Sequence, residues 1–517
     1  MNTDIIKNFK NDLPAGLVVF FVALPLCLGI ALASGAPIFS GLIAGIVGGI
    51  VVGALSGSSV GVSGPAAGLT AVVLTAISTL GSFEVFLSAV VIAGLFQIAF
   101  GLMKAGVIAY YFPSSVIKGM LTGIGLIIIL KQIPHALGYD ADLEGDLSFN
   151  QPDGHNTFSE LIYMLDYFNP SAILLSVSSL ILIIFWEKIL AKKHKIFTLI
   201  QGPIVVVFLG YLYQTLTSMY MPNMALGADH LVQVPVMEGI TSITQTLQFP
   251  NFSQILNSQV WVTALTIAVV ASLETLLCVE ATDKIDPHKR VTPTNKELFA
   301  QGVGNTISGF LGGLPITQVI IRSSANIQSG AKSKLSTIIH GVFLLVSVLA
   351  IPNILNAIPF ASLAAILLMV GYKLAKPSLF LQTYKLGKGQ FITFLVTVLG
   401  VVFTDLLTGI GLGLVVGIII ILKNSYKNSH FLHIHEEDGK KKMSMTLAEE
   451  VTFINKGAIL KELNKIPDGT QLTIDASEST SIDYDVIEVI EGFRAHASER
   501  NISVDIKTRE SLETADY

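Results

Sequence analysis

The sequence predicts an all-α membrane protein followed by a small water-soluble α/β domain. Three observations predict this class. Of the 517 residues, 51% are hydrophobic and only 13% are charged, about half the charge of an ordinary soluble domain. The charge gathers at the end, because residues 425–517 hold 29 of the 69 charged side chains. Apolar stretches that approach the length of a bilayer span recur throughout residues 1–424.

The predicted membrane part consists of fourteen transmembrane segments. A helix that spans a bilayer needs about 20 mostly apolar residues, and several of the segments are shorter. In chain order they are 14–34, 38–56, 64–80, 84–103, 114–137, 170–191, 202–216, 258–280, 294–312, 316–330, 335–352, 358–374, 388–404 and 407–424.

Lys and Arg residues predict the orientation. With the N-terminus inside and fourteen crossings, 19 of the 21 cations in residues 1–424 fall at inner ends or inner loops, and the exceptions are Lys131 and Arg322. Basic residues favour the cytoplasmic side of a membrane. We therefore expect a multi-pass protein of the cell (inner) membrane with both termini in the cytoplasm.

The composition also excludes several classes of protein. So little charge excludes a single soluble enzyme, and no basic face indicates nucleic-acid binding. The two cysteines, Cys27 and Cys278, lie in apolar runs, which favours packing over a disulfide or a metal site. No Gly-x-x-x-x-Gly-Lys-Ser/Thr run occurs, which argues against an ATP-driven pump. We expect no cofactor.

Glycines recur every fourth residue along the second segment, at Gly41, Gly45, Gly49, Gly53 and Gly57. Such a row gives a smooth face on which another helix can approach closely. Packing within the chain is favoured over a dimerisation contact.

Two segments are interrupted by glycine and proline at corresponding places in the two halves of the chain. They are Ser63-Gly64-Pro65-Ala66-Ala67-Gly68 and Gly312-Gly313-Leu314-Pro315-Ile316-Thr317-Gln318. Each predicts an extended stretch and then a half-length helix that begins inside the membrane. Paired interruptions of this kind indicate inverted repeats and a binding site at the bilayer midplane. Because a helix N-terminus presents unpaired N–H groups, the site favours an anion. The alternative is a pair of proline kinks absorbed by packing.

Two ionisable residues lie within the predicted spans. Arg322 is expected about two turns into the second half-helix, and Glu274 lies in the middle of the eighth segment. A charge at this depth is costly and usually faces a partner or a hydrated cavity. Arg322 could attract an anion or simply pair with Glu274. The glutamate could bind a coupling cation or proton, or only neutralise the arginine.

Several motifs along the chain resemble one family. They are Asp12-Leu13-Pro14-Ala15-Gly16-Leu17, Ser63-Gly64-Pro65, Asn295–Asn305, and the stretch Gly312-Gly313-Leu314-Pro315 through Arg322, Asn326 and Gly330-Ala331. Together they resemble the SulP anion transporters, the bacterial relatives of the SLC26 carriers. The resemblance implies a transport domain over 1–424, built from two inverted seven-segment repeats (about 12–216 and 258–424) that form a core and a gate.

The resemblance also implies the site. Substrate would bind between the starts of the third and tenth segments, and the coupling ion would bind at the eighth. Carried over, the substrate-binding residues are Pro65, Ala66, Ala67, Gly68, Ile316, Thr317, Gln318 and Arg322, and the coupling-ion residues are Glu274 and Cys278.

Departures from the family pattern bear on substrate and coupling. Sulfate-type members have a tyrosine where Ile30 stands, so the lining resembles that of the bicarbonate-type bacterial members more closely. Sodium-driven members have an aspartate and a hydroxyl residue where Glu274 and Cys278 stand. A thiol is a poor ligand for a hard cation, whereas a desolvated carboxyl group favours its protonated form. Proton coupling is therefore favoured over sodium coupling.

Residues 439–517 resemble a short STAS domain. The expected elements are a strand at 450–454, a helix at 457–463, a strand at 471–475, a helix at 485–499 and a strand at 502–506. The family's phosphorylated Ser or Thr would follow Asp483, where Tyr484 stands. Dimer contact or support of folding is therefore favoured over nucleotide sensing, and we expect a homodimer.

The leading hypothesis is secondary active transport of a small inorganic oxyanion, bicarbonate or sulfate, by an elevator-like movement of the core. The coupling would be a symport with a proton, or else with sodium. An anion channel, an anion exchanger, and a carrier of dicarboxylates or nucleobases on the same fold are the alternatives.

Overall fold

The structure is a computed structural model that describes residues 2–141, 149, 155–193, 197, 201–234, 247–437 and 440–508. The chain divides into two compact units, Met1–Leu414 and Val415–Tyr517. Each unit is described by itself.

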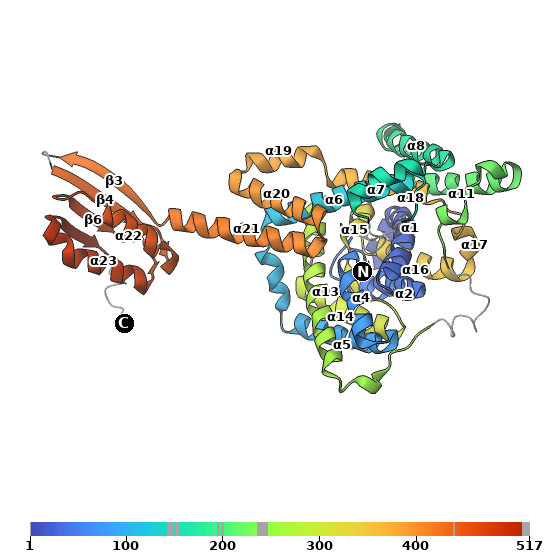
Figure 1. Ribbon diagram of the computed structural model, residues 1–517, viewed down its shortest axis with the longest axis horizontal. Helices are drawn as coiled ribbons and strands as arrows, with labels where there is room; N and C mark the ends of the chain where they lie inside the picture. The colour runs from blue at the N-terminus through green and yellow to red at the C-terminus, as the bar shows by residue number, and fades with distance from the viewer. Residues whose placement is uncertain are drawn as a thin grey trace. The chain divides into compact units, whose positions relative to one another are not determined.

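The first unit is a bundle of helices (Figure 1). They are α1 (Asn2–Ala33), α2 (Ile38–Val47), α3 (Gly53–Leu55), α4 (Thr70–Leu80), α5 (Phe83–Leu102), α6 (Ser114–Leu137), α7 (Thr157–Tyr163), α8 (Pro170–Phe185), α9 (Ala191–Lys193), α11 (Gly202–Tyr220), α13 (Ser258–Ile285), α14 (Thr294–Phe310), α15 (Ile320–Gln328), α16 (Leu335–Ala350), α17 (Pro352–Leu355), α18 (Phe360–Leu374), α19 (Pro377–Lys385), α20 (Lys388–Phe403) and α21 (Leu406–Lys427), the last of which continues into the second unit.

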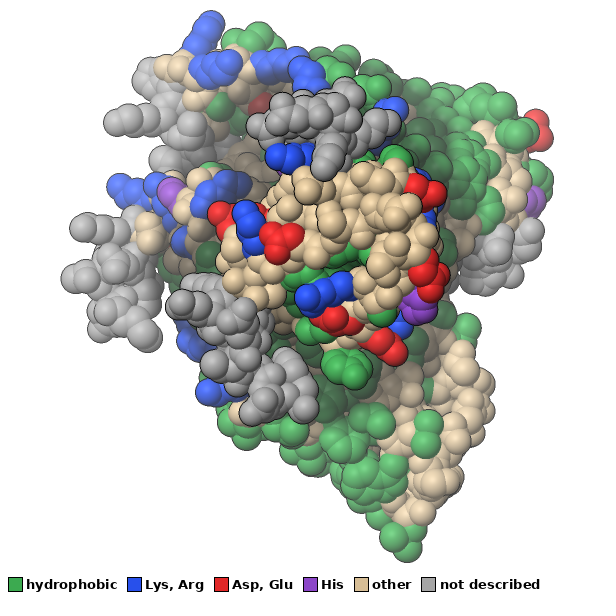
Figure 2. All heavy atoms as spheres, turned by 90° about the vertical axis from the view of Figure 1, so that its left-hand side faces the viewer, with side chains coloured by type: hydrophobic (Ala, Val, Ile, Leu, Met, Phe, Trp, Pro, Cys, Tyr) green, Lys and Arg blue, Asp and Glu red, His purple; other side chains and the backbone are tan. Residues whose placement is uncertain are grey.

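The helices of the first unit have the length and composition of membrane spans. Among the described residues, nine helices are long and apolar enough to cross a bilayer, and three shorter apolar helices accompany them. Each of the fourteen predicted segments overlaps a helix. Large apolar side chains such as Leu102, Met103 and Tyr220 are exposed, and hydrophobic side chains cover wide areas of the surface in Figure 2. A mostly helical, multi-pass membrane protein is confirmed.

The two interrupted segments form a short antiparallel crossing. Strand β1 (Ser63–Pro65) pairs with strand β2 (Ile316–Gln318) in the register Gly64 opposite Thr317. A 3-10 turn, η2 (Ala67–Leu69), joins β1 to α4, and α15 follows β2. The prediction of an extended stretch followed by a half-length helix is therefore confirmed.

The detail of the crossing differs from the prediction. The two prolines do not begin the helices, because the backbone stays extended up to Ala66 and Val319. Arg322 consequently lies in the first turn of α15 instead of two turns in. Pairing with the other strand explains the difference, because it keeps Ile316–Gln318 extended.

The glycine row packs within the chain. A Cβ atom on Gly41 would overlap the carbonyl oxygen of Cys27 in α1, and one on Gly49 would lie 2.6 Å from the Cα of Gly341 in α16. The same stretch contains a π-helical turn, η1 (Gly48–Val52). There Gly48 lets the helix approach the carbonyl group of Ser63 in β1. Packing within the chain, as predicted, accounts for these glycines.

The second unit is a small α/β domain. Its elements are β3 (His430–Glu437), β4 (Lys440–Leu447), β5 (Glu450–Val451), α22 (Lys456–Asn464), β6 (Gln471–Asp475), β7 (Ser481–Ile482), α23 (Tyr484–Ala497) and β8 (Ser503–Lys507). The main sheet has the order β3-β4-β6-β8, and a second sheet pairs β5 with β7. Figure 1 shows α22 and α23 together on one side of the main sheet. The apolar face of that sheet, with Leu472 and Ile474, is buried in one core with Ile459 of α22 and Val486 of α23.

Two features of this unit differ from the prediction. The sheet begins with the β3–β4 hairpin at His430, before the expected start at residue 439. The strand expected at 450–454 ends at Val451, because Thr452 and Asn455 form a capping box around the 3-10 turn Phe453–Asn455.

The close packing of the glycine row is testable with Gly41→Ala. The added methyl group must displace the backbone of α1, and overpacking of this kind costs about 1–3 kcal/mol. We expect a lower midpoint of thermal unfolding for the detergent-solubilised protein. The matched control is Gly411→Ala in α21, where no described atom beyond the local helix backbone and the neighbouring residues lies within 4 Å of the added Cβ. Equal midpoints for the two variants would contradict this account of the glycine row.

Candidate functional site

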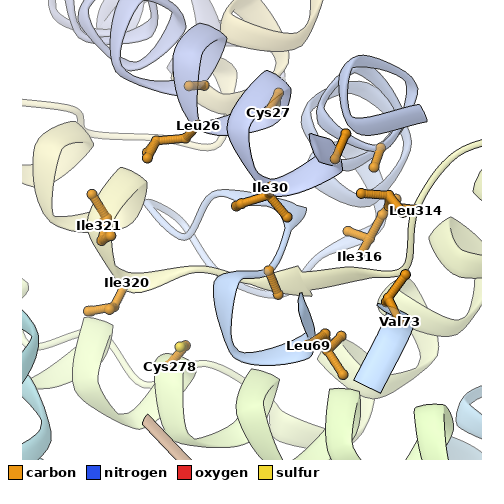
Figure 3. Close-up of a cluster of buried hydrophobic side chains, with 14 of the residues drawn as sticks. Leu26, Cys27, Ile30, Leu69, Val73, Cys278, Leu314, Ile316, Ile320 and Ile321 are labelled. Atoms are coloured by element: carbon orange, nitrogen blue, oxygen red, sulfur yellow. The ribbon is translucent and has the colours of Figure 1, made fainter. Parts of the chain in front are cut away.

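A cavity lies where the two half-helices meet. Its walls come from α1, β1, η2, α6, α13, α15 and the start of α21, and the room inside it for water-sized groups is about 30 Å³. Figure 3 shows Ile30 of α1, Cys278 of α13 and Ile320 of α15 around the crossing. The residues that line the cavity are Leu26, Ile30, Pro65, Ala67, Ile124, Glu274, Cys278, Val319, Ile320, Ile321, Arg322 and Leu406.

The starts of both half-helices lie at the cavity, where Ala67 and Ile320 line it. Among the described residues, neither N-cap residue, Ala66 of η2 or Val319 of α15, caps its helix with a side-chain hydrogen bond. Such a helix start carries a partial positive charge. Because β1 and β2 are antiparallel, the two starts follow opposite ends of the β1–β2 pair. The two helix starts therefore bring partial positive charge to the site.

Arg322 supplies the positive charge of the site. Its side chain is 1% exposed, and among the described residues neither terminal nitrogen has a hydrogen-bond partner. The guanidinium lies against Gly64 of β1, where a Cβ would overlap Nη1, and beside the Cys27 thiol. No ion pair joins Arg322 to Glu274 within the described part of the chain. The arginine is therefore not neutralised by that glutamate.

Helix α13 faces both half-helix starts with two side chains that are one turn apart. The Glu274 carboxyl group approaches the backbone N–H of Gly68 in η2, and a Cβ on Gly68 would lie 2.9 Å from its Oε1. The Cys278 thiol approaches the backbone N–H of Ile320, the first residue of α15. Glu274 is 3% exposed, and its Oε2 has no partner among the described residues. One carboxyl group thus lies at the first half-helix and one thiol at the second.

The structure separates the sequence-predicted residues into two groups. Pro65, Ala67, Arg322, Glu274 and Cys278 line the cavity. The others lie in the crossing or beside it: Ala66, Gly68, Ile316, Thr317 and Gln318.

The residues of the second group have other contacts. Gln318 donates from Nε2 to Thr282 Oγ1 of α13 at 3.1 Å, so its side chain is already engaged. Thr317 is fully buried, and its Oγ1 has no hydrogen-bond partner in the described residues. The apolar residues Ile124 and Leu406 were not expected at the site, because an apolar side chain in a span carries no sign of which face it occupies.

A wider hollow adjoins the cavity. It has room for water-sized groups of about 500 Å³ and shares Ala67 and Leu406 with the cavity. Its other walls come from Gly68 of η2, the first turn of α4, Phe149 and residues 403–408, where Asp405 accepts from the Thr408 N–H at 3.0 Å. The hollow therefore adjoins the cavity beside η2 and the start of α4.

A third polar site lies at the end of α6. Asp140 is buried and accepts from Nδ1 of His135 and Nδ1 of His230, each at 2.6 Å. Burial alone would raise the pKa of Asp140, but the two hydrogen bonds outweigh it and the pKa is lowered. The hydrogen bond to Asp140 raises the pKa of His230. This cluster could not be predicted from local sequence, because His230 lies 90 residues from Asp140.

The chain is similar to known transporters over most of its length. Residues 9–397 match the sulfate permease family. The putative sulfate transporter YvdB of Bacillus subtilis is 29% identical, over 84% of this chain and 77% of its own length. The bicarbonate transporter BicA of Picosynechococcus is 25% identical, over 81% of this chain and 71% of its own. The probable sulfate transporter 4.2 of Arabidopsis thaliana is 24% identical, over 79% of this chain and 58% of its own.

Solved structures share the fold. The transmembrane domain of a cyanobacterial bicarbonate transporter, BicA, superposes with a TM-score of 0.54, covering 80% of this chain and 97% of that one at 24% identity. The murine Solute Carrier 26 family member A9, solved in an inward-facing state, gives 0.67 and covers 96% of this chain and 85% of that one at 17% identity.

The Asp140 cluster generates a prediction on stability and pH. The carboxylate stabilises the fold above its ordinary pKa of about 3.9, and this contribution is lost as pH falls through the lowered folded value. His230 stabilises it below about 6.5, and this is lost as pH rises through the raised folded value. Asp140→Asn should therefore lower the unfolding midpoint more at pH 6 than at pH 9.

The matched control is Asp229→Asn, because that carboxyl group is 77% exposed and lies 3.6 Å from His230. It should change the midpoint little at either pH. An Asp140→Asn effect that is the same at pH 6 and pH 9 would show that the cluster does not titrate as described.

Proposed function

The chain belongs to the sulfate permease family, a family of transporters and not of enzymes, and from that premise we propose that it is a secondary active transporter of a small inorganic oxyanion, bicarbonate or sulfate. The observation that carries the proposal is Arg322, a buried cation whose two terminal nitrogens have no hydrogen-bond partner among the described residues, next to two half-helix starts whose N-cap residues give no side-chain cap. A buried charge of this kind is expensive unless a ligand pairs with it. An anion in the cavity would supply the partner.

The proposed binding residues are those carried over from the family. Pro65, Ala67 and Arg322 would contact the anion directly, because they line the cavity. The proposed roles of the others are to form the crossing that presents the helix starts: Ala66, Gly68, Ile316, Thr317 and Gln318.

We propose the family's architecture for the whole chain. Fourteen segments would form two inverted repeats, about 12–216 and 258–424, and the core would carry the site past the gate in an elevator movement. The antiparallel pairing of β1 with β2 supports this arrangement, since inverted repeats bring corresponding segments together in opposite directions. Both termini would be cytoplasmic, residues 439–517 would act as a STAS domain, and the protein would be a homodimer.

The lining of the cavity favours a singly charged anion. Leu26, Ile30, Ile124 and Leu406 offer no polar group to the ligand, and Arg322 supplies a single positive charge. The cost of desolvation rises steeply with charge, so a dianion would need more compensation than these residues give. Bicarbonate is therefore favoured over sulfate.

We propose that Glu274 carries a proton as the coupling ion. The carboxyl group is buried at the start of the first half-helix, within the same cavity as Arg322. Its neighbour one turn on is the Cys278 thiol, which is a poor ligand for sodium. A proton needs no set of oxygen ligands and only requires a carboxyl group in a dry site.

The direct test is uptake into proteoliposomes of labelled sulfate, bicarbonate, chloride and fumarate, with protein-free liposomes as the background. The outer pH stays constant, so that the bicarbonate concentration does not change, and the inner pH sets the proton gradient. We expect bicarbonate or sulfate uptake to rise with an inward proton gradient and to ignore sodium. Uptake of none of the four anions would overturn the proposal, and ungated electrical currents would favour a channel.

The role of Arg322 is testable with Arg322→Met. Neither terminal nitrogen has a hydrogen-bond partner among the described residues, and the group that loses the guanidinium is the Cys27 thiol, which is only a weak donor and acceptor, so the protein should fold. Loss of one charge-assisted contact should reduce uptake about 10- to 100-fold per folded protein. Arg290→Met is the control, because that guanidinium pairs with Asp286 at 2.7 Å outside the cavity. Unchanged uptake by Arg322→Met would refute the assignment.

Proton coupling is testable with Glu274→Gln, which imitates the protonated carboxyl group. We expect exchange of labelled for unlabelled anion to continue while stimulation by a proton gradient disappears. Glu280→Gln is the control on the same helix, because Glu280 pairs with Lys284 at 3.3 Å and does not line the cavity. Strict sodium dependence of the unaltered protein would contradict the assignment, as would a gradient response that survives in Glu274→Gln.

A further inference from the structure

Helix α14 carries a row of three polar side chains that the proposed site does not use. Glu297, Gln301 and Asn305 are spaced by one turn, and all three are fully buried. These residues also make α14 too polar to count among the apolar helices of the first unit. Buried polar groups in a membrane protein need partners. Most of their partners lie in the chain segments that form the crossing, and Asn305 also donates from Nδ2 to Gln97 Oε1 of α5 at 2.6 Å.

Asn305 binds β2 in the way that a neighbouring strand would. Its Oδ1 accepts from the Ile316 N–H at 2.5 Å, and its Nδ2 donates to the Ile316 carbonyl oxygen at 2.9 Å. This pair of bonds reproduces the double hydrogen bond between opposed residues of an antiparallel ladder. The β1–β2 pair has only three residue pairs, so the Asn305 amide adds two further hydrogen bonds to a very short sheet.

The other two side chains hold the chain that enters β1. Gln301 donates from Nε2 to Ser63 Oγ at 2.7 Å and to Glu297 Oε1 at 3.0 Å. Glu297 Oε2 accepts from Ser56 Oγ at 2.5 Å and from the Gly57 N–H at 3.3 Å. One face of α14 thus contacts both extended segments, which lie about 250 residues apart in the sequence.

We propose that Glu297, Gln301 and Asn305 of α14 are positioning residues that fix the spacing between the two half-helix starts, with Asn305 as the principal one. The inference deepens the proposed function and rests on it, since the spacing concerns the anion that both helix starts would bind. Ile316 is followed after three residues by Ile320, the first residue of α15. A shift of Ile316 therefore moves the N–H groups of α15 and Arg322 relative to η2.

A purely structural role would have a different signature. It would lower the unfolding midpoint and the amount of folded protein while leaving the affinity of each folded molecule unchanged. A positioning role changes the KM for the anion, because both helix starts must contact it at once. The ratio of the effect on KM to the effect on Vmax separates the two roles.

The test uses Asn305→Leu, which keeps the approximate size of the side chain and loses both hydrogen bonds to Ile316, together with the one to Gln97 Oε1 of α5. A displacement of about 1 Å in a binding site costs up to about 100-fold, so we expect KM to rise at least about tenfold, with a smaller change in Vmax per folded protein. Asn305→Asp keeps the acceptor for the Ile316 N–H, so its KM should lie between that of the unaltered protein and that of Asn305→Leu. If Asn305→Leu does not fold, Asn305→Asp decides by the same criterion.

Thr306→Val is the matched control. Thr306 is the next residue on α14, and its hydroxyl donates only within the helix, to the Gly302 carbonyl oxygen at 2.9 Å. It should leave KM within about twofold, a change too small to represent one lost hydrogen bond. An unchanged KM in both Asn305 variants, or an equal rise in Thr306→Val, would overturn the inference.

Hydrogen exchange in the peptide 312–320 gives a readout that does not depend on transport. Loss of the Asn305 amide should speed exchange of the backbone N–H groups in this peptide for Asn305→Leu and not for Thr306→Val. If the unaltered protein transports none of the four anions, the proposed function fails, whereas the exchange still decides whether α14 holds β2. Unchanged exchange would refute the holding role even where transport is normal.

Discussion

The fold depends on satisfying the backbone of two extended segments inside a membrane unit. Helices pair their own N–H and C=O groups, but β1 and β2 pair through only three residues each, and no water is available at that depth to bind the rest. Side chains supply the missing partners. Asn305 binds both backbone groups of Ile316, Ser323 accepts from the Val62 N–H at 2.9 Å, and Thr275 accepts from the Gln318 N–H at 3.3 Å. The polar residues of α13, α14 and α15 therefore follow from the need for irregular backbone.

Close packing of the elements around the crossing positions the charged groups of the site. Gly48 lets the helical stretch of α2 and η1 reach β1, Gly64 leaves room for the Arg322 guanidinium, and Gly68 leaves room for the Glu274 carboxyl group. A methyl group at any of these three positions would meet backbone or a charged group. The same glycines that permit the packing thus place the cation against β1 and the carboxyl group against η2.

Much of this could be predicted from sequence, and the part that could not has a common cause. Segment positions follow from local apolar composition, and Glu274 and Arg322 stood out as charges in apolar surroundings. The β1–β2 pairing could not be predicted in this way, because it depends on residues about 250 positions apart. This pairing keeps Ile316–Gln318 extended and so moves Arg322 to the first turn of α15. The Asp140 cluster and the α14 row were missed for the same reason: each is defined by its partners and not by its own pattern.

The separation of Arg322 from Glu274 has a consequence for coupling under the proposed assignment. An empty site with a cationic arginine and an ionised glutamate is neutral overall, and so is a site that holds a singly charged anion and a proton on Glu274. A site with only the anion carries one negative charge, and a site with only the proton carries one positive charge. Net charge is costly to carry through a low-dielectric region, so the empty and doubly loaded forms would cross the membrane most readily. Coupled movement of one anion with one proton then follows from charge balance alone, without any direct contact between the two ligands. A dianion would leave the loaded site charged, which again favours bicarbonate over sulfate.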